Sequence, residues 1–431
     1  MSFMTNKKFH LIIFGCQMNY SDAERLSSVL QDLGYQETKS EDEADLICIL
    51  ACSVRQAAVD RIHGKIHNWQ LTKTKRPLIT ILAGCVLPED QKKIEHKFDI
   101  FIDIKNLDNL AKAIQKIAPK EKLALPEFFD IAPSYYSKYR AHVPIMTGCN
   151  KFCTYCAVPH TRGPEVSRSS EDIIREVKKL LKQNYKEIVL LGQNVNSYGL
   201  DRKSEIKFPE LLNKIAKLNN NFWLKFLTSH PYDMSDDLIK VMADNGNINN
   251  YLHLPVQSGS DSMLKKMNRH YKIADYKKLI KKIKNKIPDI AISTDLIVGF
   301  SGETDQEFED TIKLFDELKY NMAYISQYSE RSGTTAAKLY ADDIDKKTKK
   351  QRWQIINKLL IKYSLEFNKK LINTKQEILI DVVKPDKAIG KLSNYITTHI
   401  TGDQTLEVGK FYKIKITKTL DWGLEGELIN D

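Results

Sequence analysis

The stretch Cys149-Asn150-Lys151-Phe152-Cys153-Thr154-Tyr155-Cys156 places three cysteines at the spacing C-x3-C-x2-C, directly after an apolar, strand-like segment at 143–146. Three thiolates on one short loop can hold three irons of a cubane iron–sulfur cluster. The fourth iron is then left without a protein ligand. Such an iron can chelate the amino and carboxylate groups of S-adenosylmethionine, and one electron from the cluster then breaks the sulfonium bond to give a 5′-deoxyadenosyl radical. The loop therefore predicts a radical-generating cluster.

A structural zinc knuckle is the alternative for the same residues, with His160 as the fourth ligand in a C-x3-C-x2-C-x3-H run. Zinc sites usually combine two paired units such as C-x2-C and H-x3-H, which this run does not. The aromatic side chains of Phe152 and Tyr155 also favour a cluster, because they can shield it from water. The spacing thus favours the iron–sulfur interpretation over zinc.

The composition is that of a globular protein with an anionic partner. A chain of 431 residues with 42% hydrophobic side chains has room for two to three domains with proper cores. A net charge of +11 and a pI of 9.0 point first to nucleic acid and second to a membrane surface. No apolar run has spanning length, and the apolar stretch at the start is too short for a signal peptide, so we expect a cytoplasmic protein. Seven cysteines in a reducing compartment favour metal binding over disulfides.

Three apolar segments in the first hundred residues each lead to a cysteine, at intervals typical of βα units. The segments are 10–14, 44–50 and 78–82, and the cysteines are Cys16, Cys52 and Cys85. Ser21 and Glu24 form a predicted capping box for a helix that stops at Gly34, so the chain crosses back and the strands should be parallel. Loops at the carboxyl ends of parallel strands converge, and ligands bind there. The three cysteines should therefore form a second cluster-binding set.

Cysteines at strand ends can also be plain core residues, since free cysteine packs as a small hydrophobe. The identical placement on three successive strands favours a shared site instead. Cys48 differs, because it lies four residues before Cys52, about 13 Å along an extended strand, and sits within the apolar run 46–50. We therefore expect Cys48 to be a core residue.

Strand and helix candidates alternate through the middle of the chain. The strand candidates are 143–146, 187–191, 224–228, 251–254, 290–297 and 322–328. This alternation indicates a parallel β/α barrel or part of one, whose chemistry lies at the carboxyl ends of the strands. The stretch 121–139, rich in proline and tyrosine, is interpreted as a linker between this region and the N-terminal domain.

Polar or glycine-rich segments follow these strands on the cysteine side. Each one alone could be a polar turn that closes a βα connection, but five together are better explained as the lining of a pocket. We expect S-adenosylmethionine in this pocket. The candidate contacts are Gln193, Asn194, Ser229, Gln257 and Asp295.

Arginine is scarce among the basic residues, yet four arginines lie next to the motifs. They are Arg55, Arg162, Arg168 and Arg331. The planar guanidinium fork suits phosphate and carboxylate, so we predict that these arginines contact the substrate or the cofactor rather than form surface ion pairs. The lysines between 265 and 286 recur on a helix far from any motif, which is typical of a solvated outer face.

The last part of the chain predicts a long amphipathic helix at 348–371 and then short alternating strands, including 378–383 and 412–417. The strands and their glycine-bearing turns indicate a small β-barrel of the oligonucleotide-binding type. The predicted fold is α/β, with an open parallel N-terminal domain, a central partial (β/α)6 barrel and a C-terminal small β-barrel. The predicted limits are 1–120, a linker at 121–139, 140–371 and 372–431.

Several stretches resemble the radical S-adenosylmethionine methylthiotransferase family. They are GCNKFCTYCAVPHTRGPEVSR at 148–168, GQNVNSYG at 192–199, TSHP at 228–231, HLPVQSGS at 253–260 and DLIVGF at 295–300. GCQMNYSDAERL at 15–26 resembles the family's N-terminal domain, and residues 372–431 resemble its RNA-binding TRAM domain. GQNVNSYG resembles the MiaB branch, which acts on tRNA. The alternatives are the branches that act on threonylcarbamoyl-adenosine in tRNA or on a ribosomal protein.

The resemblance implies 2-methylthiolation of N6-isopentenyladenosine beside the tRNA anticodon. It implies a radical 4Fe-4S cluster on Cys149, Cys153 and Cys156 and an auxiliary 4Fe-4S cluster on Cys16, Cys52 and Cys85, together with S-adenosylmethionine. Carbon 2 of adenine carries a hydrogen of little acidity and no leaving group, so it needs a radical supplied by a cofactor. The expected partners are the tRNA anticodon stem-loop, an electron donor such as a flavodoxin or ferredoxin, and a sulfur source, with no membrane and a monomeric enzyme.

A non-catalytic, zinc-bearing RNA-binding protein is the rival from another class. It would explain the charge, the cysteines and the terminal barrel. It would not explain the glutamine- and glycine-rich segments after the central strands. The sequence also departs from the family at Ser301, where a proline is usual, and the stretch 390–394 lacks an arginine that is common in the terminal domain.

Overall fold

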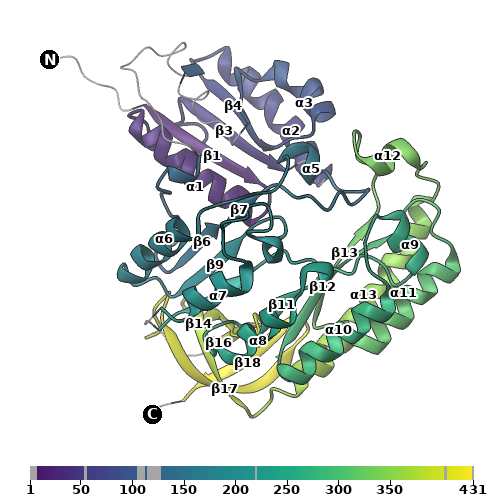
Figure 1. The fold of residues 1–431 in the computed structure, drawn as a ribbon. Helices are drawn as coiled ribbons and strands as arrows, with labels where there is room; N and C mark the ends of the chain where they lie inside the picture. Colours follow the sequence, from purple (N-terminus) through teal and green to yellow (C-terminus); the bar gives the residue numbers. More distant parts are fainter. Residues whose placement is uncertain are drawn as a thin grey trace.

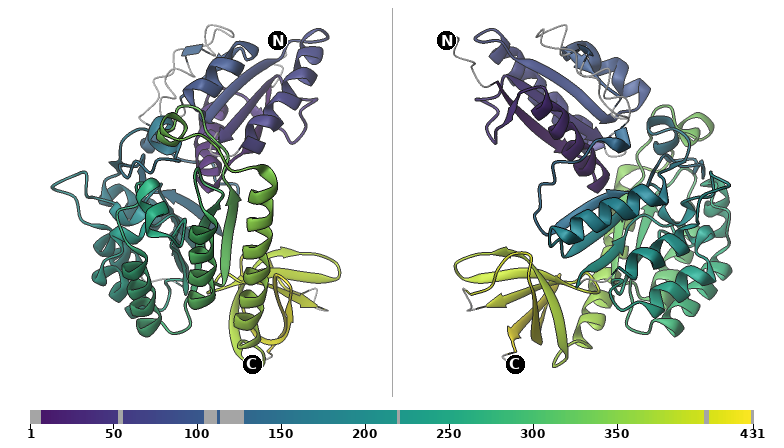
Figure 2. Two further views of the ribbon diagram at one scale, coloured as in Figure 1. Left: turned by 90° about the vertical axis from the view of Figure 1, so that its right-hand side faces the viewer. Right: turned by 60° about the vertical axis from the view of Figure 1, so that its left-hand side comes forward.

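A computed structural model describes residues 7–52, 56–103, 112–113, 128–218, 221–401 and 405–429. Figures 1 and 2 show an N-terminal α/β domain, a curved central sheet backed by helices, and a C-terminal β-barrel at the end of the molecule opposite the N-terminal domain. The predicted α/β class and all three predicted architectures are confirmed. Among the described residues, no helix has the length and apolar character needed to cross a membrane.

The N-terminal domain is a five-stranded parallel sheet in the order β2-β1-β3-β4-β5. Its elements are β1 (Lys8–Phe14), α1 (Gln17–Asp32), β2 (Gln36–Glu37), β3 (Leu46–Cys52), α2 (Gln56–Lys73), β4 (Ile79–Cys85), α3 (Pro88–Ile94), the 3-10 turn η1 (Glu95–Lys97) and β5 (Ile100–Phe101). Alternate residues of β3 pack on opposite faces, Cys48 and Leu50 in the cluster with α1, and Ile47 and Ile49 in the cluster with α2. A strand covered on both faces is apolar throughout. The prediction that Cys48 is a core residue is confirmed.

Helix α1 begins earlier than the sequence indicates. Its N-cap is Cys16, whose backbone N–H donates to Asn19 Oδ1 at 3.1 Å. The predicted capping box of Ser21 and Glu24 is wrong, because both residues lie inside the helix. The predicted end is confirmed at Gly34, where φ is 82°, a conformation that favours glycine. The early start puts Cys16 at the N-terminus of α1, directly after β1.

The central domain is an open, curved sheet of parallel strands. Its two three-stranded halves, β6-β9-β10 and β11-β12-β13, are joined by a parallel bridge between Leu224 and Ile248. The strands are β6 (Arg140–Pro144), β9 (Glu187–Leu191), β10 (Trp223–Phe226), β11 (Tyr251–His253), β12 (Ala291–Val298) and β13 (Met322–Gln327). All six predicted strands are present, with limits shifted by a few residues.

Helices and short segments connect these strands. The helices are α5 (Val158–Thr161), α6 (Ser170–Lys182), α7 (Phe208–Ala216), α8 (Asp236–Asp244), α9 (Asp261–Lys266), α10 (Ile273–Lys286), α11 (Asp305–Leu318), α12 (Thr335–Leu339) and α13 (Lys346–Lys369). The short segments are β7 (Met146–Thr147), β8 (Val166–Ser167) and the 3-10 turns η2 (Phe128–Asp130), η3 (Val195–Ser197) and η4 (Pro231–Asp233). The helix predicted at 348–371 is confirmed as α13.

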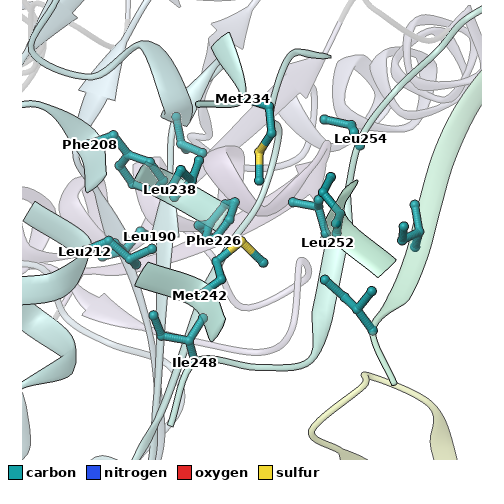
Figure 3. Close-up of a cluster of buried hydrophobic side chains, with 14 of the residues drawn as sticks. Leu190, Phe208, Leu212, Phe226, Met234, Leu238, Met242, Ile248, Leu252 and Leu254 are labelled. Carbon is teal, nitrogen blue, oxygen red and sulfur yellow. The ribbon is translucent and has the colours of Figure 1, made fainter. Parts of the chain in front are cut away.

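The main hydrophobic core lies between the curved sheet and the outer helices (Figure 3). Leu190, Phe226 and Leu252 of the strands meet Phe208 and Leu238 of the helices. The rings of Phe208 and Phe226 pack edge to face with centroids 5.1 Å apart. Burial of each such side chain stabilises the fold by about 1.5–3 kcal/mol. The core thereby fixes the strand ends from which the pocket segments project.

The terminal domain is a closed barrel in the order β14-β15-β16-β18-β17, which confirms the predicted small barrel. Its strands are β14 (Lys375–Val383), β15 (Lys387–Leu392), β16 (Thr397–Thr401), β17 (Phe411–Leu420) and β18 (Gly423–Leu428). Asp381 accepts hydrogen bonds from Tyr139 Oη at 3.0 Å and from Arg140 Nη2 at 2.8 Å. The rings of Trp223 and Phe411 lie 4.9 Å apart. These contacts dock the terminal barrel on the amino-terminal end of the central strands, opposite the predicted site.

The predicted domain limits stay predictions. The limit near residue 120 and the first part of the linker 121–139 lie outside the described residues. The end of the linker lies alongside α1, because the Ser134 N–H donates to the Glu24 carbonyl at 2.9 Å. The limit at 371–372 falls between α13 and β14.

Candidate cluster and cofactor site

The loop 149–156 is fixed by backbone contacts on every side. Gly148 before it has a φ of 77°, and a Cβ there would lie 1.8 Å from the Pro164 carbonyl oxygen, so only glycine fits. Thr154 donates from its N–H to the Met267 carbonyl at 3.1 Å, and its own carbonyl accepts from the Ala336 N–H at 2.7 Å. The loop therefore holds its three cysteines in a defined arrangement.

The three thiols of this loop lie within electrostatic reach of one another. The pKa of the Cys149 thiol is raised to about 11 and that of Cys156 to about 12, mainly by burial, and the neighbouring Cys153 thiol contributes to both shifts. Two N–H groups point at the sulfurs, the Val158 N–H at 3.4 Å from Cys156 Sγ and Arg269 Nη1 at 3.5 Å from Cys153 Sγ. N–H donors to sulfur stabilise bound iron–sulfur clusters and tune their potential. The residues present therefore fit a cluster.

The zinc alternative finds less support. A zinc ion needs several ligands about 2.0–2.3 Å from one point. No group of three His, Cys, Asp or Glu side chains in the described ranges is arranged to hold a single metal ion. His160, the proposed fourth ligand, is exposed on α5. Phe152 is also exposed, at 56%, so its predicted shielding role is wrong. Tyr155, by contrast, packs against a group of buried hydrophobic side chains.

Two of the five predicted cofactor contacts have buried acceptor atoms that no described residue satisfies. They are Gln193 Oε1 and Asn194 Oδ1, which follow β9. A buried carbonyl oxygen without a donor is costly, by about 1–3 kcal/mol. Both atoms lie at the carboxyl end of the strand, on the side of the cysteine loop. They suit a ligand with N–H donors, such as the amino group or the adenine of S-adenosylmethionine.

The other three predicted contacts interact within the protein, Ser229 and Asp295 through their side chains and Gln257 through its backbone N–H. Ser229 Oγ donates to the His253 carbonyl. Gln257 has a φ of 75°, and its N–H donates to the Asp295 carbonyl at 2.9 Å. The Asp295 carboxylate lies 3.4 Å from His253 Nε2. Their contact with the cofactor stays a prediction.

A carboxylate that the sequence analysis missed ties the cysteine loop to the pocket. Asp233 accepts from Lys151 Nζ at 2.7 Å and from Asn194 Nδ2 at 2.7 Å. Lys151 belongs to the cysteine loop and Asn194 to the segment after β9. Asp233 lies just past the TSHP stretch, and its position after a strand was the available signal. The contact leaves Asn194 Oδ1 as the free end of that amide.

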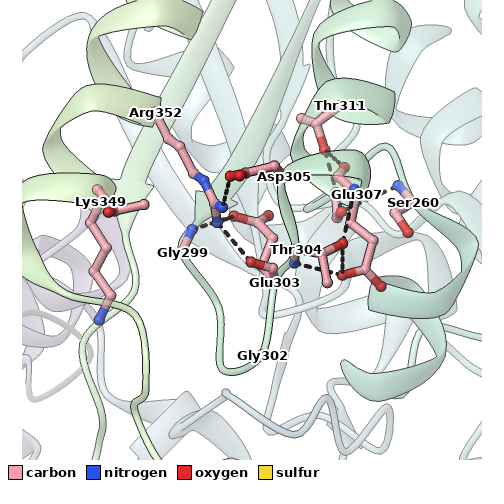
Figure 4. Close-up of polar contacts among 12 residues, drawn as sticks. Ser260, Gly299, Gly302, Glu303, Thr304, Asp305, Glu307, Thr311, Lys349 and Arg352 are labelled. Atoms are coloured by element: carbon pink, nitrogen blue, oxygen red, sulfur yellow. Dashed lines mark hydrogen bonds and ion pairs between the residues drawn. The ribbon is translucent and has the colours of Figure 1, made fainter.

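The segment after β12 is locked to α13 (Figure 4). Glu303 is buried and accepts from the Gly299 N–H and from Arg352 Nη1, each at 2.7 Å. Arg352 also pairs with Asp305 at 2.8 Å through Nη2. Removing one partner of such a buried pair costs about 3–5 kcal/mol. This glutamate therefore holds the turn rather than reaching into the pocket.

The second cysteine set comes together at the carboxyl ends of three strands, as predicted. Cys52 and Cys85 are register partners at the ends of β3 and β4, and Cys16 follows β1. Asn19 bridges the set, because its Oδ1 accepts from the Cys16 N–H and its Nδ2 lies 4.0 Å from Cys85 Sγ. The sulfur ligation of this set stays a prediction, but the three strand ends do converge.

Arg162 lies at the junction of the N-terminal and central domains. Its Nε donates to Cys85 Sγ at 2.8 Å, and its fork pairs with both oxygens of Asp22. Burial raises the pKa of the Cys85 thiol, while the Arg162 guanidinium acts to lower it. Arg162, six residues after Cys156, thus links the segment of the cysteine loop 149–156 to the second cysteine set.

The other predicted arginines have different surroundings. Arg168 is buried, pairs with Glu176 at 2.7 Å and donates to the Pro144 carbonyl at 2.7 Å, contacts that favour a structural role. Burial lowers the pKa of Arg331, and the nearby Asp90 and Cys52 oppose that shift. Arg331 is therefore within electrostatic reach of Cys52, one member of the second cysteine set. Arg55 lies outside the described residues, and contact of any of these arginines with a substrate stays a prediction.

Three family models match the chain in sequence order. They are the Uncharacterized protein family UPF0004 at residues 8–104, the Radical SAM superfamily at residues 143–315 and the TRAM domain at residues 369–429. Their order and limits follow the three parts of the fold.

Curated relatives match over nearly the whole chain. The tRNA-2-methylthio-N(6)-dimethylallyladenosine synthase of Thermoanaerobacter sp. (strain X514) is 38% identical over 440 residues, covering 98% of this chain and 93% of the relative. The protein of the same name from Carboxydothermus hydrogenoformans is 38% identical over 442 residues, covering 99% of this chain and 100% of the relative. That from Clostridium botulinum (strain Langeland) is 37% identical over 438 residues, covering 98% and 97%.

Solved structures share the fold. The radical S-adenosylmethionine methyltransferase TsrM from Kitasatospora setae, with cobalamin and a 4Fe-4S cluster bound, superposes with a TM-score of 0.55 at 12% identity and covers 77% of each chain. The cobalamin-dependent S-adenosylmethionine radical enzyme OxsB gives a TM-score of 0.54 at 12% identity, covering 82% of this chain and 56% of that chain. At this identity the likeness establishes the architecture alone.

Proposed function

The chain belongs to the family of the tRNA-2-methylthio-N(6)-dimethylallyladenosine synthases, and from that membership we propose that it methylthiolates carbon 2 of N6-isopentenyladenosine beside the tRNA anticodon. The observation that carries the proposal is the near-complete alignment at 38% identity with relatives of this name. The enzyme is a radical S-adenosylmethionine methylthiotransferase. The reaction requires a radical and a sulfur donor. The two cysteine sets lie in different domains and so provide a separate place for each.

We assign the radical cluster to Cys149, Cys153 and Cys156. When bound, a 4Fe-4S cluster with S-adenosylmethionine supplies the radical that an unreactive aromatic C–H bond requires. The chain's own part is to hold the loop through Thr154 and to direct N–H groups at two of the sulfurs. The buried carbonyl oxygen of Gln193, which has no donor among the described residues, would accept from N–H donors of the cofactor.

We assign an auxiliary cluster to Cys16, Cys52 and Cys85, whose three thiols from three strand ends would hold it. When bound, this cluster would supply the sulfur chemistry that methylthiolation needs. The further partners that this chemistry requires are an electron donor such as a flavodoxin or ferredoxin and a sulfur source. We expect a monomeric enzyme that meets its tRNA in the cytoplasm.

The proposed function can be tested by comparing tRNA that carries the prenyl group with tRNA that lacks it. The isopentenyl group is apolar and should pack against apolar or aromatic side chains, so unmodified adenosine is expected to react poorly for lack of that contact. The anaerobically reconstituted protein is incubated with S-adenosylmethionine, a chemical reductant and sulfide, and with matched tRNAs that carry the prenyl group, lack it or carry threonylcarbamoyl-adenosine instead, and the nucleosides are measured by mass spectrometry. Equal turnover of both tRNAs would contradict the proposal. Product on threonylcarbamoyl-adenosine alone would favour the alternative branch.

The terminal barrel is expected to grip the tRNA through exposed lysines. Lys375 and Lys415 are register partners on β14 and β17, and both are exposed. Replacing both with glutamine should weaken tRNA binding and reduce the slope of log affinity against log salt by about 2, because each phosphate contact releases counterions. Binding is measured by filter retention at several salt concentrations.

The matched control replaces Lys278 and Lys281, which are exposed on the outer helix α10, with glutamine. That variant should keep the parent slope if α10 is a solvated face. An unchanged slope for the barrel variant, or a larger loss of tRNA affinity for the α10 variant, would show that the phosphates do not bind at Lys375 and Lys415.

A further inference from the structure

Arg162 connects the segment after the cysteine loop 149–156 to Cys85 of the second cysteine set. It follows Cys156 by six residues, just after α5, which lies at the junction of the N-terminal sheet and the central domain (Figure 1). The side chain is 4% exposed. Its guanidinium therefore acts in a low-dielectric interior, where charges and hydrogen bonds act strongly.

The guanidinium contacts the second cysteine set at two points. Nε donates to Cys85 Sγ at 2.8 Å. The other two nitrogens pair with Asp22, which is fully buried on α1, the helix that begins at Cys16. Because the guanidinium is a rigid fork, its pairing with Asp22 fixes the direction of the N–H bond to sulfur.

The potential of an iron–sulfur cluster depends on nearby charge, on burial and on hydrogen bonds to its sulfurs. We propose that Arg162 is a positioning residue that raises the reduction potential of the cluster held by Cys16, Cys52 and Cys85, and that Asp22 limits this effect. The inference rests on the proposed function, since it requires that cluster. It assigns Arg162 to the auxiliary cluster instead of to the RNA or the cofactor.

A purely structural ion pair is the competing explanation, and the chain contains a matched example. Arg168 is also buried, lies six residues further on and pairs with Glu176. Its contacts are the Glu176 carboxylate, the Pro144 carbonyl and the ring of Phe129, none of which is a cysteine. Loss of Arg168 should therefore destabilise the fold without a change in cluster potential.

The test uses the full chain with Cys149, Cys153 and Cys156 all changed to alanine, so that reconstituted iron reports the auxiliary cluster alone. Reductive titrations followed by electron paramagnetic resonance then give its potential in four backgrounds, the parent, Arg162→Met, Asp22→Asn and Arg168→Met. Arg162→Met removes the hydrogen bond and leaves Asp22 uncompensated, whereas Asp22→Asn leaves the positive charge uncompensated. The two shifts should therefore have opposite signs.

We expect Arg162→Met to lower the reduced-to-oxidised ratio at a fixed potential at least tenfold, which is 59 mV for one electron. Asp22→Asn should raise the ratio, and Arg168→Met should leave it unchanged. Arg162→Lys, which keeps the charge without the fork, should give a smaller shift in the direction of Arg162→Met, and it serves as the second variant if Arg162→Met does not fold.

Parent-like potentials in both Arg162 variants, shifts of the same sign in Arg162→Met and Asp22→Asn, or an equal shift in Arg168→Met would overturn the inference. If the variant that lacks Cys149, Cys153 and Cys156 binds no iron, both the inference and the assignment of the auxiliary cluster are overturned. The assay with prenylated tRNA separates these cases, because methylthio product formed by the unaltered chain supports the proposed function whichever residue sets the potential.

Discussion

Replacement of Cys153 with alanine is expected to abolish the reductive cleavage of S-adenosylmethionine to 5′-deoxyadenosine. Cys153 lies between Cys149 and Cys156 in the sequence, and its Sγ receives the N–H of Arg269 at 3.5 Å. An iron that loses its thiolate destabilises the cluster that must deliver the electron. The measurement is 5′-deoxyadenosine formed by the reconstituted variant with a chemical reductant, together with its iron content.

The iron content should fall by about half, since the second cysteine set is intact and holds about four of about eight irons. Cys48→Ala is the matched control, because it removes a buried cysteine that belongs to neither set. Cofactor cleavage at the parent rate in Cys153→Ala would show that the loop 149–156 does not hold the radical cluster.

Replacement of Cys52 with alanine is expected to leave cofactor cleavage in place while the methylthio product disappears. Cys52 ends β3 beside Cys85, in a different domain from the radical loop. Removing it takes a ligand from the sulfur-carrying cluster and spares the source of the radical. The measurement pairs 5′-deoxyadenosine with modified nucleoside in the same reaction.

Cys48→Ala again serves as the control, because Cys48 lies on the same strand with its side chain in the core against α1. A small cavity there should cost on the order of 1 kcal/mol of stability, with both activities retained. Loss of cofactor cleavage in Cys52→Ala, with the iron of the radical cluster still present, would contradict the division of labour between the two sets.

The architecture could be predicted from the sequence because it depends on local patterns. Each apolar segment that became a strand is followed by polar or glycine-rich residues, and alternation with helices favours parallel pairing. The same logic placed Cys16, Cys52 and Cys85 together, since parallel strands bring their carboxyl ends to one edge. Cys48 could be assigned to the core from its spacing to Cys52 and its place in the apolar run 46–50.

The surroundings of the arginines could not be predicted because they depend on tertiary contacts. Arg162 is paired with Asp22, 140 residues earlier, and no local pattern records that contact. A guanidinium beside a motif suggested an anionic ligand, but carboxylates of the protein itself, Asp22 and Glu176, supply the anion for Arg162 and Arg168. The prediction that Phe152 shields the cluster was wrong because aromatic character alone does not determine whether a side chain on a loop faces the interior.

The link between the cofactor pocket and the cysteine loop also depends on tertiary contacts. Asp233 and Lys151 meet only because the segment after β10 folds over the loop. The unsatisfied oxygens of Gln193 and Asn194 are visible only once burial is known. Polar residue type indicated the right side of the barrel, whereas the structure indicates which atoms are free.

Iron and acid-labile sulfide per chain, measured after anaerobic reconstitution of the full-length protein, decide whether two clusters are present. Two sets of three cysteines predict about eight irons and about eight sulfides per chain, with the brown colour of 4Fe-4S clusters. About four irons would contradict the auxiliary cluster. A colourless protein that retains zinc would contradict the assignment of both cysteine sets.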